Sequence, residues 1–305
     1  MTEFQGNGGS DAVGGDGATQ RVSTTNGVPL AAIIEELVAL QRRRRFCIVS
    51  QSRDDRSTES FIADMLGYRS DLTEGERAKL FKQASTIRKM VEKGGGEDQL
   101  APVTHARAVL SAAAPIIIAS KQGREGFDAM RKAAEKRMRD LARKLPVYPW
   151  AASIEGLGDL GLAVVIAECP GDNLAGLADY GNPAKMWKRC GLAVINGERQ
   201  RKKIDAEQAA LHAYSPRRRA TVYGDIGAPL FFAKAKNYLG EVYAERRAHT
   251  AVMHPEWSKA HSDNDARRYI TKRLLRDLWR AWRAAMAKLS PSEDMPPANL
   301  SDAAD

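Results

Sequence analysis

Apolar residues return every three to four positions along most of this chain, which is the spacing of one face of a helix. The first apolar face is formed by Leu30, Ile33, Ile34, Leu37 and Leu40. It runs into a block of arginines at 42–45, so a helix with a strongly cationic end is predicted there. A second helix is predicted over 57–67, between a Ser/Thr start and a glycine stop, and the apolar run 46–49 is compatible with a short strand.

Further helices are predicted before residue 146, over 73–92, 105–120 and 127–145. Consecutive glycines at 94–96 break the chain after the first of them, and Pro146 ends the last. Proteins with a parallel sheet alternate strands with helices, and this part of the sequence shows no such alternation. Residues 28–146 are therefore predicted to form a helical N-terminal module.

A turn soon after Pro146 has one apolar residue between two glycines. Gly156, Leu157 and Gly158 form this turn, and an apolar helix that contains Gly161 follows at once. Glycine permits backbone angles that other residues avoid, and bare amides at the start of the next helix can hold a phosphate oxygen. The pattern is that of a helix-hairpin-helix, with Leu157 pointing inward. An ordinary turn between two core helices fits the same pattern, and Asp159 would compete with a phosphate for the amides.

Basic residues are dense after this turn, and the whole chain has a formal net charge of +9 and a pI near 9.5. The candidate DNA contacts are Gly156, Leu157, Gly158 and Gly161 at the hairpin, and the basic residues Lys185, Lys188, Arg189, Arg199, Arg201, Lys202, Lys203, Arg217 and Arg218. Such a density of cations suits sequence-independent binding to a sugar-phosphate backbone. A solvated basic face without a partner is the alternative.

The predicted fold is mainly α, with the helical N-terminal module followed by a helix-hairpin-helix C-terminal domain at 150–288. That domain is expected to end in a long basic helix over 264–285, whose aromatic side faces the core. Residues 1–27 are rich in Gly, Ser, Thr and Asn and are predicted to be a disordered tail without a leader sequence. Residues 289–305 are predicted to be a frayed tail.

Two segments of the second half resemble a known family. Residues 154–172 and 177–193 contain the Gly-Leu-Gly hairpin, an Ala-rich helix, an acidic turn and a Gly-Leu-Ala turn. In this order they are similar to the C-terminal domain of the insertion sequence 110 group of transposases. A looser likeness extends through 214–219, where the family has a basic stretch that opens another helix. The resemblance implies a protein that handles DNA in transposition or recombination.

Members of that family cut and rejoin DNA with a RuvC-like N-terminal half, which holds magnesium on four carboxylates, and with a serine shortly after the Gly-Leu-Ala turn. In this chain residues 194–201 follow that turn and contain no serine, and the N-terminal half lacks carboxylates on alternating strands. The catalytic residues are therefore unknown, and the sequence leaves open whether the chain is an enzyme. Magnesium is expected only if a carboxylate site exists, and no other cofactor is assigned.

Other candidate chemistry has a structural interpretation that fits better. Arg53 precedes the acidic cluster at 54–64, and Arg56 lies within it. These arginines favour a charge-balanced helix start. Ser215 precedes Pro216 and is expected to cap a helix rather than to act as a nucleophile.

Histidines and cysteines do not suggest a metal site. The histidines at 249, 254 and 261 are irregularly spaced in a polar segment and lack a partnering cysteine. Cys47, Cys169 and Cys190 are widely spaced, and they are expected to be buried, unpaired residues in a reducing cytoplasm.

No apolar run approaches the roughly 20 residues that span a membrane, so a cytoplasmic location without a membrane partner is expected. The leading hypothesis is a DNA-binding protein of the insertion-sequence transposase type. The alternatives are an active recombinase with an unassigned catalytic site and a non-catalytic helical assembly protein. RNA as a ligand and self-association into a homo-oligomer stay open.

Overall fold

The computed structural model describes residues 24–25, 28–95 and 106–289, so the predicted tails fall almost entirely outside the described residues. Most of the described chain is helical, which confirms the mainly α fold predicted from the apolar spacing. Two short antiparallel strand pairs are present in this part: β1 (Thr24–Thr25) with β2 (Val28–Pro29), and β3 (Val194–Ile195) with β4 (Glu198–Arg199).

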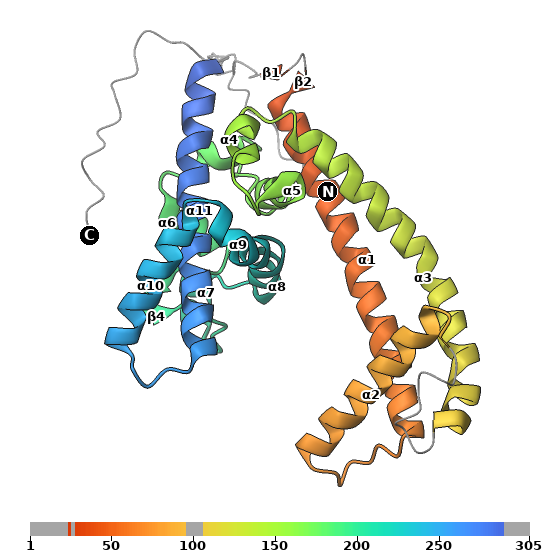
Figure 1. Cartoon of the computed structure of the whole chain (residues 1–305). Coiled ribbons are helices and arrows are strands. Elements are labelled where there is room, and N and C mark those ends of the chain that lie inside the picture. The colour runs from red at the N-terminus through yellow and green to blue at the C-terminus, as the bar shows by residue number, and fades with distance from the viewer. Residues whose placement is uncertain (1–23, 26–27, 96–105, 290–305) are drawn as a thin grey trace, which may run out of the picture.

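The first three helices form an elongated arm, in which α1 and α3 run side by side and α2 lies at the far end (Figure 1). Their bounds are Leu30–Met65 for α1, Glu74–Glu92 for α2 and Ala106–Ala142 for α3. A capping box starts α2, since the Thr73 side chain accepts from the Glu76 amide and the Glu76 carboxylate accepts from the Thr73 amide. A buried cluster at the far end of the arm holds the three helices together.

Two predicted interruptions in the arm, between 45 and 57 and between 120 and 127, are wrong, because α1 and α3 are each one continuous helix. Residues 46–49 belong to α1 and form no strand: Cys47 is buried, while Phe46 is 61% exposed, as helical geometry requires of neighbouring positions. No glycine or proline lies between Leu30 and Met65 to break the helix. In α3, Pro115 lies inside the helix, and Ile117, two positions on, is buried in the far-end cluster.

The acidic cluster of the arm has a different role from the predicted charge-balanced helix start. Its residues lie in the second half of α1 and bind two arginines of the other arm helices. Arg88 of α2 contacts Asp55 and Glu59 at 3.0 Å each, and Arg124 of α3 contacts Asp54 at 3.2 Å. These carboxylates therefore join α1 to both neighbouring helices.

The remainder of the chain packs around the upper end of the arm in short helices, followed by a pair of longer ones (Figure 1). The short elements are α4 (Tyr148–Ala152), α5 (Gly158–Glu168), η2 (Gly176–Asp179), α6 (Pro183–Arg189), α7 (Ala206–His212), α8 (Pro216–Thr221), η3 (Val222–Gly227), α9 (Ala228–Ala233) and η4 (Lys234–Lys236). The long pair is α10 (Leu239–Met253) and α11 (Lys259–Leu289), and α11 exceeds the predicted 264–285 at both ends.

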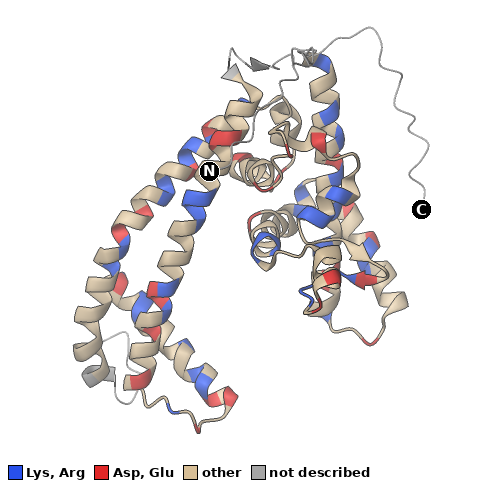
Figure 2. Ribbon diagram, turned by 180° about the vertical axis from the view of Figure 1, so that it is seen from behind, with Lys and Arg blue, Asp and Glu red and all other residues tan. Residues whose placement is uncertain are grey.

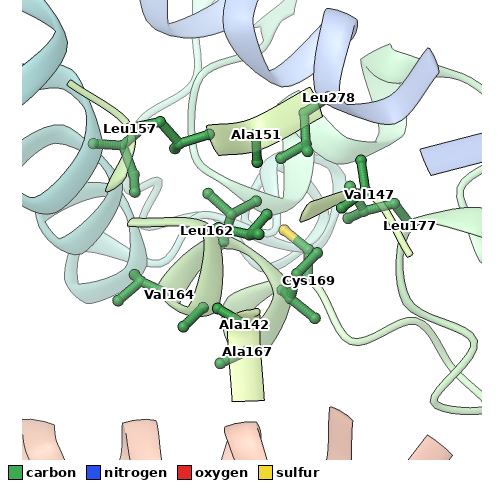
Figure 3. Close-up of a cluster of buried hydrophobic side chains, with 14 of the residues drawn as sticks. Ala142, Val147, Ala151, Leu157, Leu162, Val164, Ala167, Cys169, Leu177 and Leu278 are labelled. Carbon is green, nitrogen blue, oxygen red and sulfur yellow. The ribbon is translucent and has the colours of Figure 1, made fainter. Parts of the chain in front are cut away.

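Helix α5 lies at the centre of the larger core. Figure 3 shows side chains of α5 and its flanks meeting residues from α4, from the segment that precedes it and from α11. The labelled residues are Ala142, Val147, Ala151, Leu157, Leu162, Val164, Ala167, Cys169, Leu177 and Leu278. The same core includes Trp282 of α11, which is 1% exposed, so at this position the aromatic side of the last helix faces the core as expected.

This core also crosses the predicted boundary at 146–150, because it includes α1 residues such as Leu37 and α3 residues such as Met138. The division into two domains stays a prediction. What the packing shows is that the base of the arm and the helices after 146 share one hydrophobic interior.

Candidate nucleic-acid interface

The predicted glycine turn lies between α4 and α5. Gly156 has φ +91° and Gly158 has φ +61°, both in the left-handed region that favours glycine. Leu157 is 3% exposed and points into the core, as expected. The local geometry of the turn therefore follows from the Gly-Leu-Gly sequence.

The surroundings of the turn are less open than binding of a phosphate requires. Gly156 lies beneath α9, where an added Cβ would be 2.7 Å from the Ala233 Cβ. Gly161 packs against Leu157 inside the turn. Gly158 has open space beside it and lines a hollow of about 390 Å³. Of the three predicted glycine contacts, Gly158 alone has its Cα side open.

Carboxylates accompany this hollow. Asp159, in the first turn of α5, accepts hydrogen bonds from Arg143 at 2.7 Å and from the Tyr148 hydroxyl at 3.2 Å. Asp225 lines the hollow as well, and Arg139 is the basic residue among the lining side chains. The hairpin side of α5 therefore offers a phosphate two negative neighbours.

The opposite, C-terminal end of α5 has a different character. Two hollows of about 260 and 100 Å³ adjoin there and share Arg189 and Arg218 in their walls, and we call them together the basic groove. The charged residues that line the basic groove are Arg42, Arg45, Glu168, Asp172, Lys185, Lys188, Arg189, Arg217 and Arg218. Seven cations from α1, α6 and α8 thus face two carboxylates.

Glu168, the last residue of α5, organises the floor of the groove and is 6% exposed. Its carboxylate accepts hydrogen bonds from Gln41 at 3.1 Å and from Arg218 at 3.3 Å, and it lies 3.6 Å from Arg45. Its backbone oxygen accepts from the Arg189 Nε at 3.2 Å. The carboxylate and the backbone oxygen of Glu168 therefore bring cationic side chains from α1, α6 and α8 to one place.

The groove keeps a clear excess of positive charge. Within the described residues, the guanidinium groups of Arg42 and Arg217 make no hydrogen bond or ion pair, and the same holds for the Lys185 and Lys188 ammonium groups. Burial and then the neighbouring charge of Arg217 lower the pKa of Arg45. An anion that enters the groove would relieve this repulsion.

The arginine block of α1 divides by helix face. Arg42 and Arg45, three positions apart, lie on the groove side, whereas Arg44 is buried and binds Glu135 at 2.9 Å and Asp225 at 2.8 Å. These ion pairs hold α1 against α3 and against η3, a single π-helical segment. These pairs therefore fix the position of Arg42 and Arg45 along the wall of the groove.

On the other wall, α8 begins as the sequence predicts. The Ser215 hydroxyl accepts from the Arg218 amide at 3.2 Å, and Pro216 occupies the first turn. Ser215 is therefore an N-cap, and it sets Arg217 and Arg218 at the start of a helix that faces α1.

The remaining predicted cations lie outside the groove, on and after β4. Arg199 pairs with Asp265 at 2.8 Å, while Arg201 and Lys203 contact Glu198 at 3.3 and 2.6 Å. Lys202 is exposed. The predicted basic cluster thus separates in space: Lys185, Lys188, Arg189, Arg217 and Arg218 come together, and Arg199, Arg201, Lys202 and Lys203 form another surface.

Arg42 and Arg45 were missing from the predicted site residues. A signal for them was present, because a run of arginines on an amphipathic helix must place some members away from the apolar face. Which helix they would face could not be inferred from that run.

The cysteines and two of the histidines are packed against other side chains. All three cysteines are buried and free, as expected, and the Cys169 and Cys190 sulfurs are 3.5 Å apart beneath the groove. The rings of His254 and His261 stack on either side of Trp257. Across the described residues, no group of three His, Cys, Asp or Glu side chains could hold a metal ion, and none of the helices there is long and apolar enough to cross a membrane.

Comparison of the chain with protein-family models, with curated proteins and with solved structures finds no match.

Proposed function

We propose that this chain binds DNA by its phosphate backbone, through the basic groove at the C-terminal end of α5. The observation that carries the proposal is the convergence of seven Lys and Arg side chains from α1, α6 and α8 on two joined hollows that hold two carboxylates. Helices far apart in the sequence supply these cations, so their meeting is a property of the fold.

The chemistry of the groove suits phosphates more than bases. Guanidinium groups form forked hydrogen bonds with phosphate oxygens, and lysines add charge without demanding one geometry. Binding of this kind releases counterions, so affinity falls steeply with salt and varies little with DNA sequence. The resemblance of 154–172 and 177–193 to the transposase domain supports DNA as the polyanion, and a role in transposition or recombination is the prediction that follows from it.

The proposal places the phosphate contacts at the groove and not at the hairpin amides. Gly156 is covered by α9, and Asp159 and Asp225 flank the open side of Gly158. In contrast, the groove brings together four cations whose charged groups make no hydrogen bond or ion pair in the described structure, which are Arg42, Lys185, Lys188 and Arg217.

The test is a pair of matched charge reversals. Lys185→Glu with Lys188→Glu alters the groove, and Lys79→Glu with Lys82→Glu makes the same change on exposed positions of α2 at the far end of the arm. Affinity for a fluorescent DNA duplex is measured by anisotropy over a series of salt concentrations. We expect the groove variant to lose about tenfold or more in affinity, with a salt slope less steep by about two, because each phosphate contact contributes about 0.9 to the slope.

The arm variant controls for net charge, since both pairs lower the charge of the chain equally. We expect its affinity to fall by about threefold or less, as long-range attraction is screened beyond roughly 10 Å at moderate salt. Equal losses in the two variants, or no binding by the unaltered chain at low salt, would refute the groove as a DNA site.

A further inference from the structure

The smaller hollow of the basic groove, which we call the arginine pocket, has a composition unlike the rest of the groove. Its charged lining residues are Arg42, Arg45, Arg189, Arg217, Arg218 and Glu168. It encloses about 100 Å³, a volume that suits one phosphate group and is too small for a nucleoside. The larger hollow, by comparison, contains lysines and has more than twice that volume.

The charge of the arginine pocket exceeds what an internal phosphate of a DNA strand would balance. Five guanidinium groups and one carboxylate leave an excess of four positive charges. A phosphodiester carries one negative charge, whereas a phosphate monoester carries about −1.5 to −2 at neutral pH and has three strong acceptor oxygens. A monoester therefore fits this concentration of donors better.

Two side chains of the pocket, the buried Gln41 and the largely buried Arg45, each have one polar atom without a hydrogen bond among the described residues. Gln41 is 3% exposed, and its Nε2 donates to Glu168, but its Oε1 has no partner among the described residues. The buried Nη1 of Arg45 likewise makes no hydrogen bond there. Buried polar atoms are nearly always satisfied, and both of these residues line the pocket, so a ligand there could supply the missing partners. An oxygen of a phosphate bound in the pocket would accept from Arg45, and its P–OH group would donate to Gln41.

We infer that the arginine pocket binds the terminal phosphate monoester of a nucleic-acid strand whose backbone lies in the larger hollow. Arg189 and Arg218 belong to the walls of both hollows, so a strand in the larger one reaches the pocket with its end. This inference rests on the proposed function, because it needs a strand in the groove. It adds that the chain distinguishes a phosphorylated strand end from a hydroxyl end.

The experiment compares one short duplex with and without 5′-phosphates, bound to the full chain. We expect the phosphorylated duplex to bind about tenfold more tightly, the effect of one strong charge-assisted contact. Arg42→Gln should reduce the preference to about twofold or less, since one of the five pocket cations is lost. Arg43→Gln is the matched control, because Arg43 is the exposed neighbour on the same helix and does not line the pocket.

Each outcome has a separate meaning for the pocket and for the groove. Equal binding of both duplexes with steep salt dependence would overturn the pocket inference and leave the proposed function intact, and so would a preference that Arg42→Gln retains. If neither duplex binds, the proposed function fails and inorganic phosphate decides about the pocket. Thermal stabilisation by phosphate of the unaltered chain but not of Arg42→Gln would then assign the pocket to a free phosphate monoester, and any other result would refute it.

Discussion

At its first residue α5 meets a glycine turn packed beneath α9, and at its last residue, Glu168, it meets arginines from three other helices. The helix has 11 residues, so about 16 Å separates the two ends. The N-terminal end has the backbone pattern that suggests phosphate binding, with two carboxylates nearby. The C-terminal end has no such pattern, yet seven cations meet there, and the charged groups of four of them make no hydrogen bond or ion pair in the described residues. The glycine motif therefore predicts a turn, whereas the binding site depends on which charged side chains the tertiary fold brings together.

The largest effect that bears on this comparison is expected from Arg44→Ala. Arg44 binds Asp225, which lines the hairpin-side hollow, whereas its neighbours Arg42 and Arg45 line the groove. Removing one partner of a buried ion pair typically costs about 3–5 kcal/mol. Urea unfolding should show a loss of this size. Arg43→Ala, at an exposed position, should change the unfolding free energy by about 0.5 kcal/mol or less. Similar losses in both variants would refute the role of Arg44 in holding α1 against α3 and η3.

A smaller effect on stability is expected at the turn itself. Gly156→Ala combines a left-handed backbone with a Cβ that would lie 2.7 Å from Ala233, so a loss of about 3 kcal/mol is expected. Gly158→Ala has a left-handed backbone and open space, so about 1 kcal/mol is expected. Thermal unfolding of the two variants measures the difference. If Gly158→Ala were the more damaging, the turn would be packed differently from the structure described above.

The smallest effect is expected from Asp159→Asn, and it separates the two ends most directly. The change removes an ion pair with the exposed Arg143, and such surface pairs contribute little to stability. If the groove carries the binding, DNA affinity at a fixed salt concentration should change by about twofold or less, because the altered charge lies beyond the Debye length of roughly 10 Å. A clear gain in affinity would mean that the hairpin amides hold a phosphate after all.

Much of the secondary structure could be predicted from the sequence, since the apolar spacing and the caps are local signals. The Thr73 capping box and the Ser215 cap both act within a single turn of helix. The length of α1 was missed because the apolar run 46–49 looks like a strand until its neighbours on the helix face are known. Local patterns do not say that two predicted helices are one.

The candidate site was half predictable for a related reason. Lys185, Lys188 and Arg189 lie on one short helix, so their proximity follows from sequence. Arg199 follows them closely in the chain, yet a strand pair takes it to Asp265 on another surface. Arg42 reaches the groove from far upstream because Arg44, two positions on, fixes α1 to η3. Such long-range pairings depend on tertiary packing and leave no spacing to detect.

The continuity of α1 gives the arm a mechanical property. The ion pairs of Arg44 with Glu135 and Asp225 anchor α1, and from Arg45 to Met65 the unbroken helix extends about 30 Å towards the far end of the arm. Interspersed charges, visible as alternating blue and red along both long helices in Figure 2, tie α1 to α3 along this length. Any rotation of α1 about this anchor would therefore displace the far end of the arm and, at the same time, shift Arg42 and Arg45 relative to α8.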